Sequence, residues 1–381
     1  KFALFVMFMK CSSLIPPTLL KRQRNSKFST QMKTDFSACH YAVIGGGFAG
    51  LSVAYNLVKQ GANVTVFDPK DVGSGGASSV SAGLIHPLTP RGKLAWKGVE
   101  GYHAALEQIQ DSSKALLNET KSGLLLSKGH CSVVSELSIM KPLFEEKEVK
   151  MYKERAQSMP EWLDIVSKSE IQLFHEKVSD NALCGVLIKN SLVIDSRAYM
   201  KGLWQCCVNS SKEAKWVKEH FEMKRLFGDS DFDGFVLAIG TDIKAFSELF
   251  NSNEIRLVKG YNTFIENKGT APKVSILRGE YIVPTKHEGK DAYLVGSMQE
   301  HINYEKVHEE TDWTQVEAKS KELYEKVEFL CPGLTSGRKL GYTSGTRVIR
   351  DKGKWGRLPI IGKVGGHDSK CWVVTGWGVG G

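Results

Sequence analysis

The stretch that most constrains this chain is VIGGGFAGLSVAYNLVKQGANVTVFD, which runs from Val43 to Asp68. Its glycines form a GxGxxG pattern, and an acidic residue follows 23 positions after the first of them. An apolar run, YAVI, precedes the glycines, a helical pattern closed by Gly61 follows them, and NVTVFD has the composition of a second strand. In this strand–turn–helix–strand order the glycine pattern indicates a dinucleotide site.

Each position of the pattern has a physical reason. Gly45 permits a tight turn, Gly47 lets a pyrophosphate approach the backbone, and Gly50 lets the helix pack closely on the strand. The free N–H groups and the positive end of the helix then bind the phosphates, and the acid accepts hydrogen bonds from a ribose diol. The alternative is a glycine-rich turn without a ligand. The residues expected to contact the cofactor here are Gly45, Gly47, Phe48, Ala49, Gly50 and Asp68.

The length and the later strands predict two domains. The 381 residues exceed the roughly 100–200 of a typical domain. The runs FDGFVLAIGTD and CWVVTGWGVGG are apolar strands ending in glycine, whereas IRLVKGYNTFIE, GEYIVPTK and AYLVGSMQ have the pattern of an antiparallel sheet. We therefore expect an α/β fold (α+β overall), with a Rossmann-like domain from discontinuous segments and an inserted antiparallel-sheet substrate domain. The first comprises residues 41–115, 190–250 and 338–381, and the second residues 116–189 and 251–337.

The first 40 residues differ from the rest in charge. They carry seven Lys/Arg and one acid, so they account for +6 of the formal +9 and leave +3 for the remainder. This Ser/Thr-rich, acid-poor composition is typical of an organelle transit peptide, with a plastid (chloroplast) favoured over a mitochondrion and the cytoplasm as the alternative. A disordered or wrongly assigned upstream region is the alternative interpretation. Because the sequence begins with Lys1 and not with Met, we expect its true start to lie further upstream. A charge of +3 gives a nucleic-acid partner little support.

Two further classes of site are not expected. The eight cysteines contain no CxxC pair and no Cys/His spacing suited to zinc, so we expect no metal and no disulfide framework. No apolar run reaches the ~20 residues of a membrane helix.

Four motifs in order resemble the D-amino-acid oxidase family of flavoenzymes, which includes glycine oxidase and sarcosine oxidase. They are VIGGGFAGLSVA…VTVFD, GASSVSAGLIHPL, FDGFVLAIGTD, and SGTRVIRDKGKWGRLPIIGKV leading into VVTGWGVGG. The likeness extends from about Ala42 to the end of the chain. Within the family, AGLIHPL and TRVIRD…LPIIG look most like the oxidase domain of the bacterial bifunctional enzyme that modifies a tRNA wobble uridine.

The resemblance implies FAD, bound extended and without a covalent link. The glycines of the first turn would hold its pyrophosphate and Asp68 its adenosine ribose. The resemblance also implies that Ala77 and Ser78 lie along the pyrophosphate and ribityl chain and that Gly83 and Leu84 lie near the isoalloxazine ring. Gly240 matches the glycine that ends the second nucleotide-contacting strand. Gly376 and Gly378 match a last turn that stabilises the reduced flavin.

For the substrate, the resemblance assigns Arg347 to a carboxylate clamp, since arginine pairs bidentately with a planar carboxylate. Arg350 is a nearby alternative, and a surface salt bridge is the purely structural reading. Tyr281 matches a substrate-side tyrosine, with a core tyrosine as the alternative. His86 is expected to be a packed or capping residue and not a base.

The expected function is an FAD-dependent oxidoreductase that oxidises the C–N bond of an amino acid or N-substituted glycine by hydride transfer to the flavin. One alternative is the same chemistry on the carboxymethylaminomethyl group of a tRNA wobble uridine. Another is an inactive, truncated flavin-binding isoform, because the family continues into a helix where this chain stops at Gly381. The substrate, the electron acceptor and the oligomeric state are left open.

Overall fold

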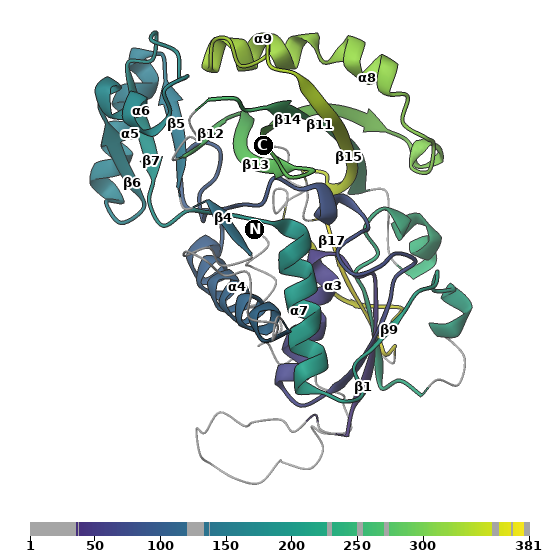
Figure 1. Cartoon of the computed structure of the whole chain (residues 1–381). Coiled ribbons are helices and arrows are strands. Elements are labelled where there is room, and N and C mark those ends of the chain that lie inside the picture. The colour runs from purple at the N-terminus through teal and green to yellow at the C-terminus, as the bar shows by residue number, and fades with distance from the viewer. Residues whose placement is uncertain are drawn as a thin grey trace, which may run out of the picture.

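The computed structural model describes residues 36, 38–119, 133–136, 138–226, 231–249, 254–269, 274–352, 358–366 and 369–376. The expected leader, apart from its last few residues, and Gly378 lie outside these ranges. Figure 1 shows two parts, one above the other, with strands β1 and β9 and helix α7 in the lower part and α8 and α9 at the top.

The lower part is built on a six-stranded sheet in the order β16-β17-β10-β1-β2-β9. All neighbouring strands are parallel except β16 and β17. Its strands come from three distant parts of the chain, as the discontinuous Rossmann-like domain required. They are β1 (His40–Ile44), β2 (Asn63–Phe67), β9 (Lys215–Val217), β10 (Gly234–Leu237), β16 (Ile360–Val364) and β17 (Cys371–Thr375).

Alternating side chains of β1 define two faces of this sheet. Tyr41 and Val43 lie in one core cluster with residues of α3 and α7, whereas Ala42 and Ile44 lie in another with residues of η4 and of the second sheet. A buried parallel strand with cores on both faces explains why YAVI is apolar throughout. The helices and 3-10 turns of this part are α3 (Phe48–Lys59), η2 (Ala77–Val80), α4 (Gly98–Glu119), α7 (Ser196–Ser210), η3 (Met223–Leu226) and η4 (Gly240–Leu249).

The upper part is an eight-stranded sheet in the order β15-β11-β14-β13-β12-β5-β7-β6, in which only β12 and β5 pair in parallel. Its strands are β5 (Ile139–Leu143), β6 (Leu163–Val166), β7 (Cys184–Ile188), β11 (Ile255–Glu266), β12 (Ser275–Arg278), β13 (Glu280–His287), β14 (Lys290–Ile302) and β15 (Lys339–Arg350). A small sheet in the order β3-β8-β4 contains β3 (Leu84–Ile85), β4 (Val134–Glu136) and β8 (Leu192–Ile194).

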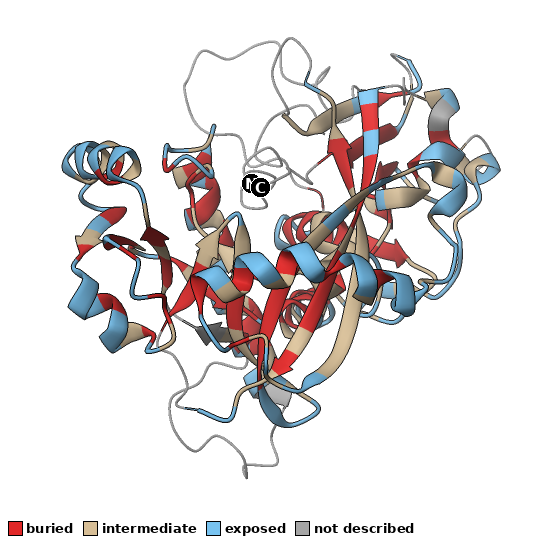
Figure 2. Cartoon of the chain, turned by 90° about the horizontal axis from the view of Figure 1, so that it is seen from above, coloured by how far each residue is buried: buried red, intermediate tan, exposed pale blue. Residues whose placement is uncertain are grey.

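Helices cover the upper sheet, and Figure 2 shows buried strands beneath helices whose outward faces are exposed. Leu323, Val327 and Leu330 of α9 pack into the core with strand residues such as Ile282 and Val295. The helices of this part are α5 (Glu146–Ser158), α6 (Lys168–Phe174), α8 (Trp313–Lys319) and α9 (Lys321–Leu330), with the 3-10 turn η6 (Tyr304–Lys306) after β14.

The predicted fold class is confirmed: a Rossmann-like parallel sheet is combined with a second, mostly antiparallel sheet. The segment 338–381 differs from the prediction. The sequence predicts that all of it belongs to the nucleotide-binding domain, whereas β15 pairs with β11 in the upper sheet. Of its strands, only β16 and β17 lie in the lower sheet. In the described part of the chain, no helix combines the length and apolar character needed to cross a membrane.

Candidate active site

The glycine turn between β1 and α3 has the close backbone contacts that exclude larger residues. Gly45 has φ +99°, and its N–H donates to the carbonyl oxygen of Phe67 at 2.8 Å. A Cβ atom on Gly45 would overlap the carbonyl oxygen of Ala238, and one on Gly50 would overlap the carbonyl oxygen of Gly45. The turn and the helix therefore approach the sheet as closely as only glycine permits.

Asp68, at the end of β2, holds this turn through its carboxylate. Its Oδ2 accepts a hydrogen bond from the Gly46 N–H at 2.7 Å, and its Oδ1 accepts one from the Lys70 N–H at 2.8 Å. A carboxylate oxygen can accept two hydrogen bonds, so this half-buried side chain keeps acceptor capacity for a diol. Asp68 thus stabilises the loop itself in addition to its predicted contact with a ribose.

The N-terminus of α3 is open. Gly47 is its N-cap and provides no side-chain cap, and the first turn contains no acidic residue. The Phe48 N–H donates to Ser78 Oγ at 3.1 Å. Among the described residues, the N–H groups of Gly47, Ala49 and Gly50 have no acceptor. Unpaired N–H groups at the positive end of a helix suit a phosphate.

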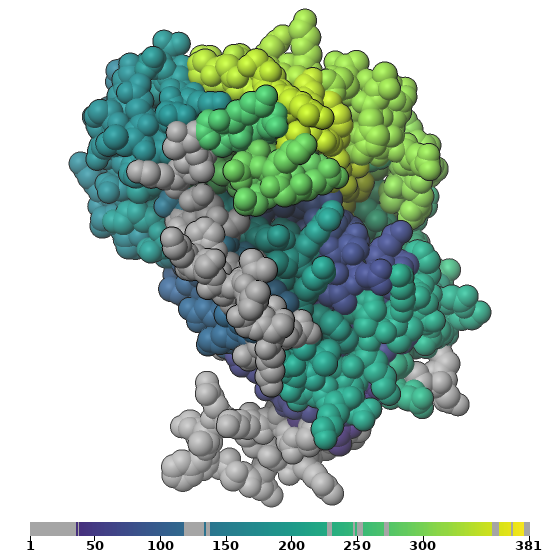
Figure 3. All heavy atoms as spheres, viewed as in Figure 1, coloured from purple at the N-terminus to yellow at the C-terminus, as the bar shows by residue number. Residues whose placement is uncertain are grey.

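The loop that contains Ala77 and Ser78 forms η2 and is fixed between the two parts of the molecule. Arg197 Nε on α7 donates to the Ser79 carbonyl at 3.1 Å, and Asn262 Nδ2 on β11 donates to the Val80 carbonyl at 3.2 Å. A Cβ atom on Gly345 of β15 would lie 2.6 Å from Val80 Cγ2 and 2.9 Å from Ala77 Cα. In Figure 3, purple atoms of this early part of the chain lie between the yellow-green upper part and the teal lower part.

The AGLIHPL segment continues from this loop. Gly83 has φ +70°, its carbonyl accepts the Ile194 N–H at 3.1 Å, and a Cβ atom there would overlap the Ile194 carbonyl. Leu84, in β3, is half-buried. His86 Nδ1 accepts the Leu88 N–H at 3.2 Å, and burial lowers the pKa of His86 to about 4. This neutral, turn-capping histidine fits the expected packing role.

The two later glycine turns differ in their surroundings. Gly240 (φ +53°) is exposed at the start of η4, and apart from its chain neighbours no atom of the described residues lies within 4 Å of the position its Cβ would take. Gly376 (φ +76°) is buried after β17, where such a Cβ would lie 3.4 Å from Arg350 Cβ and 3.6 Å from the Ile360 nitrogen. Gly378 lies outside the described residues.

Arg347 and Arg350 lie on the same strand, β15, but their side chains have different surroundings. Arg350 donates from Nε and Nη2 to Glu254 Oε2 at 2.9 and 2.7 Å, so its charge is paired. Arg347 Nη2 is buried and has no hydrogen-bond partner among the described residues. Burial lowers the pKa of Arg347, and the nearby Tyr281 raises it. The side chain as a whole is half-buried, and none of the ion pairs found among the described residues includes it. A partly buried cation without an anion beside it is costly, so Arg347 could accommodate an anionic ligand.

Tyr281, on β13, lies close to Arg347 in space. Its hydroxyl donates to Asn262 Oδ1 at 2.6 Å. Burial raises the pKa of Tyr281 to about 12, while the charge of Arg347 and the interactions with Ser297 and Asn262 act in the opposite direction. The phenol is therefore neutral near pH 7. The upper sheet thus brings together the two predicted substrate residues, which are 66 positions apart in the sequence.

Sequence reasoning missed Asn262 and Trp216. Asn262 joins Tyr281 to η2, and nothing in the pattern of NTFIE distinguishes it from an ordinary strand asparagine. The Trp216 indole fills the space beside Gly46, where a Cβ atom would overlap its ring, and its Nε1 donates to the Lys70 carbonyl at 3.1 Å. The middle glycine of GGG, which the GxGxxG pattern does not require, was the available signal for a close neighbour at this point.

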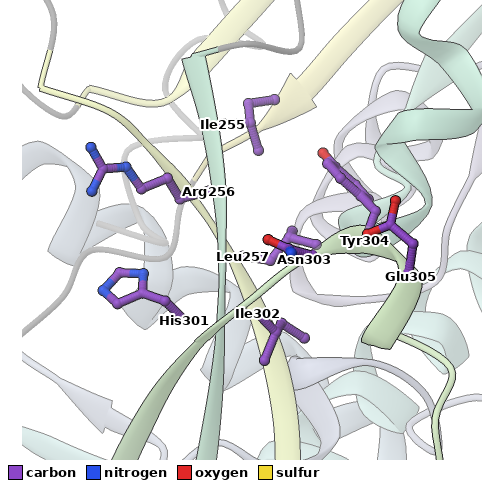
Figure 4. A pocket seen from close by; sticks show the side chains of 8 residues that line it. All are labelled: Ile255, Arg256, Leu257, His301, Ile302, Asn303, Tyr304 and Glu305. Carbon is purple, nitrogen blue, oxygen red and sulfur yellow. The ribbon is translucent and has the colours of Figure 1, made fainter.

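A surface pocket of about 540 Å³ lies elsewhere, at the ends of β11 and β14. Figure 4 shows Arg256 and His301 on one side of β11 and Tyr304 and Glu305 on the other. It contains none of the predicted site residues, and Arg256 and Glu305 are already paired with Asp351 and Lys244. The described residues contain no group of three or more His, Cys, Asp or Glu side chains suited to a metal ion.

The residues that surround the glycine turn fit a cofactor with a pyrophosphate. The turn excludes side chains at Gly45 and Gly50, the start of α3 offers free N–H groups, and η2 is anchored beside it through Ser78. Arg347, predicted to bind a carboxylate, lies on the strand that packs against the same loop through Gly345.

Comparisons with known proteins agree with this geometry. The family model described as FAD dependent oxidoreductase matches residues 40–381. The glycine oxidase of Geobacillus kaustophilus is 18% identical, with a TM-score of 0.64 and 88% of each chain covered. The iminodiacetate oxidase of Chelativorans sp. BNC1 is 17% identical, with a TM-score of 0.63 and coverage of 89% of this chain and 90% of that one.

A curated relative, the uncharacterized oxidoreductase YurR of Bacillus subtilis, is 26% identical over 215 residues, or 54% of this chain. The match spans about half of that relative's length, 52%. The solved structures establish the fold, and the family model extends from β1 to the end of the chain. The chain therefore belongs to the FAD-dependent oxidoreductases of the D-amino-acid oxidase family, an enzyme family whose cofactor is FAD.

Proposed function

We propose that this enzyme oxidises the C–N bond of an amino acid or an N-substituted glycine. The observation that carries the proposal is the half-buried guanidinium of Arg347, whose buried Nη2 has no hydrogen-bond partner among the described residues, beside the neutral hydroxyl of Tyr281. FAD supplies a two-electron acceptor that takes a hydride from the carbon next to the amine. Two proteins of the same fold are named for small amino acids of this kind, glycine and iminodiacetate.

Arg347 would bind the substrate carboxylate. A planar carboxylate pairs with two guanidinium N–H groups, and burial strengthens this interaction because water no longer screens it. Arg350 is unsuited to the role, since Glu254 already occupies its Nε and Nη2. The clamp fixes one end of the substrate and so limits how the reacting carbon faces the cofactor.

The protein contributes positioning and not a general base in this proposal. Tyr281, with a pKa of about 12, does not accept a proton near pH 7. His86 is neutral there and its Nδ1 is occupied by the Leu88 N–H. Hydride transfer needs no enzyme base for the C–H bond, so holding the substrate in a reactive geometry is the main requirement.

The test combines a flavin spectrum with anaerobic reduction. The purified full chain should show flavin absorption bands, and glycine, N-methylglycine or iminodiacetate should bleach them without oxygen. Arg347→Leu should raise the apparent KM for the active substrate by 100-fold or more, the equivalent of about 3 kcal/mol for a buried charged pair. Arg350→Leu is the matched control on the same strand, with an expected change below threefold.

Two results would contradict the proposal. A folded sample without flavin bands would exclude the chemistry altogether. An equal rise in KM for Arg347→Leu and Arg350→Leu would show that Arg347 does not bind the substrate carboxylate, while the assignment of FAD as the cofactor would stand.

A second candidate is the same oxidation on a carboxymethylaminomethyl group of a tRNA wobble uridine. It is supported by the resemblance of AGLIHPL, and that group also carries a carboxylate for Arg347. A salt-sensitive gel shift with tRNA would favour it, because phosphate contacts give a steep salt dependence. No shift at low salt would favour a free amino acid.

A further inference from the structure

Asn262 connects the anion site to the cofactor loop. It lies on β11 and is 6% exposed. Its Nδ2 donates to the Val80 carbonyl at 3.2 Å, and its Oδ1 accepts from the Tyr281 hydroxyl at 2.6 Å. Val80 ends η2, the turn whose Ser78 Oγ receives the first N–H of α3. One asparagine therefore bridges the two halves of the active site.

The chemistry of these partners fixes the direction of both hydrogen bonds. A carbonyl oxygen only accepts, so the amide NH₂ of Asn262 must face Val80 and its oxygen must face Tyr281. A phenol has a single proton, and here it points at Asn262. The Tyr281 oxygen therefore presents lone pairs, and no proton, to the remaining space around it.

Two neighbouring residues of β14 lie against this pair. Ser297 interacts with the Tyr281 hydroxyl. Gly296 leaves the space that the pair occupies: a Cβ atom there would overlap Asn262 Oδ1 and lie 2.7 Å from Tyr281 Oη.

We propose that Asn262 is a positioning residue that makes Tyr281 a hydrogen-bond acceptor, which receives an N–H of the substrate's amine while Arg347 binds the carboxylate. This inference rests on the proposed function and adds a determinant of specificity. Arg347 alone binds any carboxylate, whereas Tyr281 as an acceptor favours a carboxylate with a donor on the next carbon. If Tyr281 instead donated to the carboxylate, it would favour every carboxylate equally.

The experiment measures binding of two matched ligands to the FAD-loaded enzyme. 2-Aminoisobutyrate and pivalate have nearly the same shape and differ by an amine in place of a methyl group. Neither has a hydrogen on the carbon that would be oxidised, so neither is turned over. Their dissociation constants can be measured by calorimetry and by the change in the flavin absorption spectrum.

Tyr281→Phe should raise the dissociation constant of 2-aminoisobutyrate about tenfold, the loss of one hydrogen bond to a charged group, and leave that of pivalate within twofold. Asn262→Ala should shift the ratio of the two constants in the same direction. In the double variant the ratio should match that of Tyr281→Phe alone, because Asn262 acts through Tyr281. Gly296→Ala, which breaks the same pair from the other side, should reproduce Asn262→Ala.

The outcomes distinguish a failure of this inference from a failure of the proposed carboxylate site. Equal weakening of both ligands by Tyr281→Phe would overturn the inference, since it would mean that the tyrosine donates to the carboxylate. Additive effects in the double variant would overturn the positioning role of Asn262. If neither ligand binds the wild-type enzyme, or if Arg347→Leu leaves pivalate binding unchanged, the proposed carboxylate site fails and the inference fails with it. Thermal melting of each variant checks the fold, and the ratio of constants is insensitive to a general loss of stability.

Discussion

Replacement of His175 should remove much of the enzyme's sensitivity to acid. The side chain is 1% exposed, stacks against Tyr293 with ring centroids 6.0 Å apart, and neither ring nitrogen has a hydrogen-bond partner among the described residues. Burial lowers the pKa of His175 to about 4, and the nearby Lys177 adds to this effect. The folded state therefore disfavours the imidazolium form, which the unfolded chain accepts readily.

The direction in which stability changes with pH follows from proton uptake by the unfolded state. An unfolded histidine titrates near 6.5, so between about pH 6.5 and pH 4 the unfolded state binds the proton that the folded state excludes. The stability due to the neutral ring is fully present above pH 6.5 and is lost as the pH falls. At about 1.4 kcal/mol per pKa unit, the loss is roughly 2 kcal/mol at pH 5 and about 3 kcal/mol below pH 4.

The assay is denaturant unfolding of the FAD-saturated enzyme between pH 5 and pH 7.5. His175→Leu should reduce the fall in the free energy of unfolding over this range by roughly 2 kcal/mol. The control is His301→Leu, which removes a histidine at an exposed position of β14. Equal pH slopes for the wild type and His175→Leu would refute the reasoning, because the buried ring would then not be a source of acid sensitivity.

Two predictions concern the cofactor turn. Gly46→Ala should weaken FAD binding at least tenfold, since a Cβ atom there would overlap the Trp216 ring, and Trp216→Val in the same chain should restore much of it. Fluorescence titration of the apoprotein with FAD measures both, and the absence of rescue would disprove this steric explanation. Ser78→Ala removes the hydroxyl that accepts the Phe48 N–H and should raise the FAD dissociation constant about fivefold, equivalent to about 1 kcal/mol. The conservative variant Ser78→Thr, which keeps the hydroxyl, should bind FAD more tightly than Ser78→Ala, and an equal loss in both would contradict this role.

The parts of the fold that depend on interactions between residues close in the sequence could be predicted from the sequence. The turn at Gly45 and Gly50 is such a part, because backbone contacts within a few residues and one neighbouring strand determine it. The role of Asn262 could not be predicted, since it depends on hydrogen bonds to residues 182 and 19 positions away. The same holds for Trp216, whose nearest functional neighbour, Gly46, is on the far side of β2 in the sheet order.

The position of β15 shows a second limit. Its twelve residues, Lys339–Arg350, include two glycines and three Ser or Thr and show little alternation of polar and apolar residues, so the pattern does not tell which sheet the strand joins. That choice depends on pairing with β11, which begins 84 residues earlier. For the two arginines of this strand, the sequence favoured Arg347 through the resemblance alone and kept Arg350 as the alternative. The pairing of Arg350 with Glu254 is the physical difference between them, and it depends on a residue 96 positions away.

The order of strands in the lower sheet has a consequence for synthesis. The central strand β1 emerges from the ribosome among the first described residues, but its neighbour β10 is made nearly 200 residues later, and β17, which covers the outer edge of β10, follows at Cys371–Thr375. Until β10 is made, β1 can pair with β2 only, and until β17 is made, β10 has one unpaired edge. Pairings over such separations form slowly, so the growing chain passes through a long interval in which binding of FAD is not yet available to stabilise it.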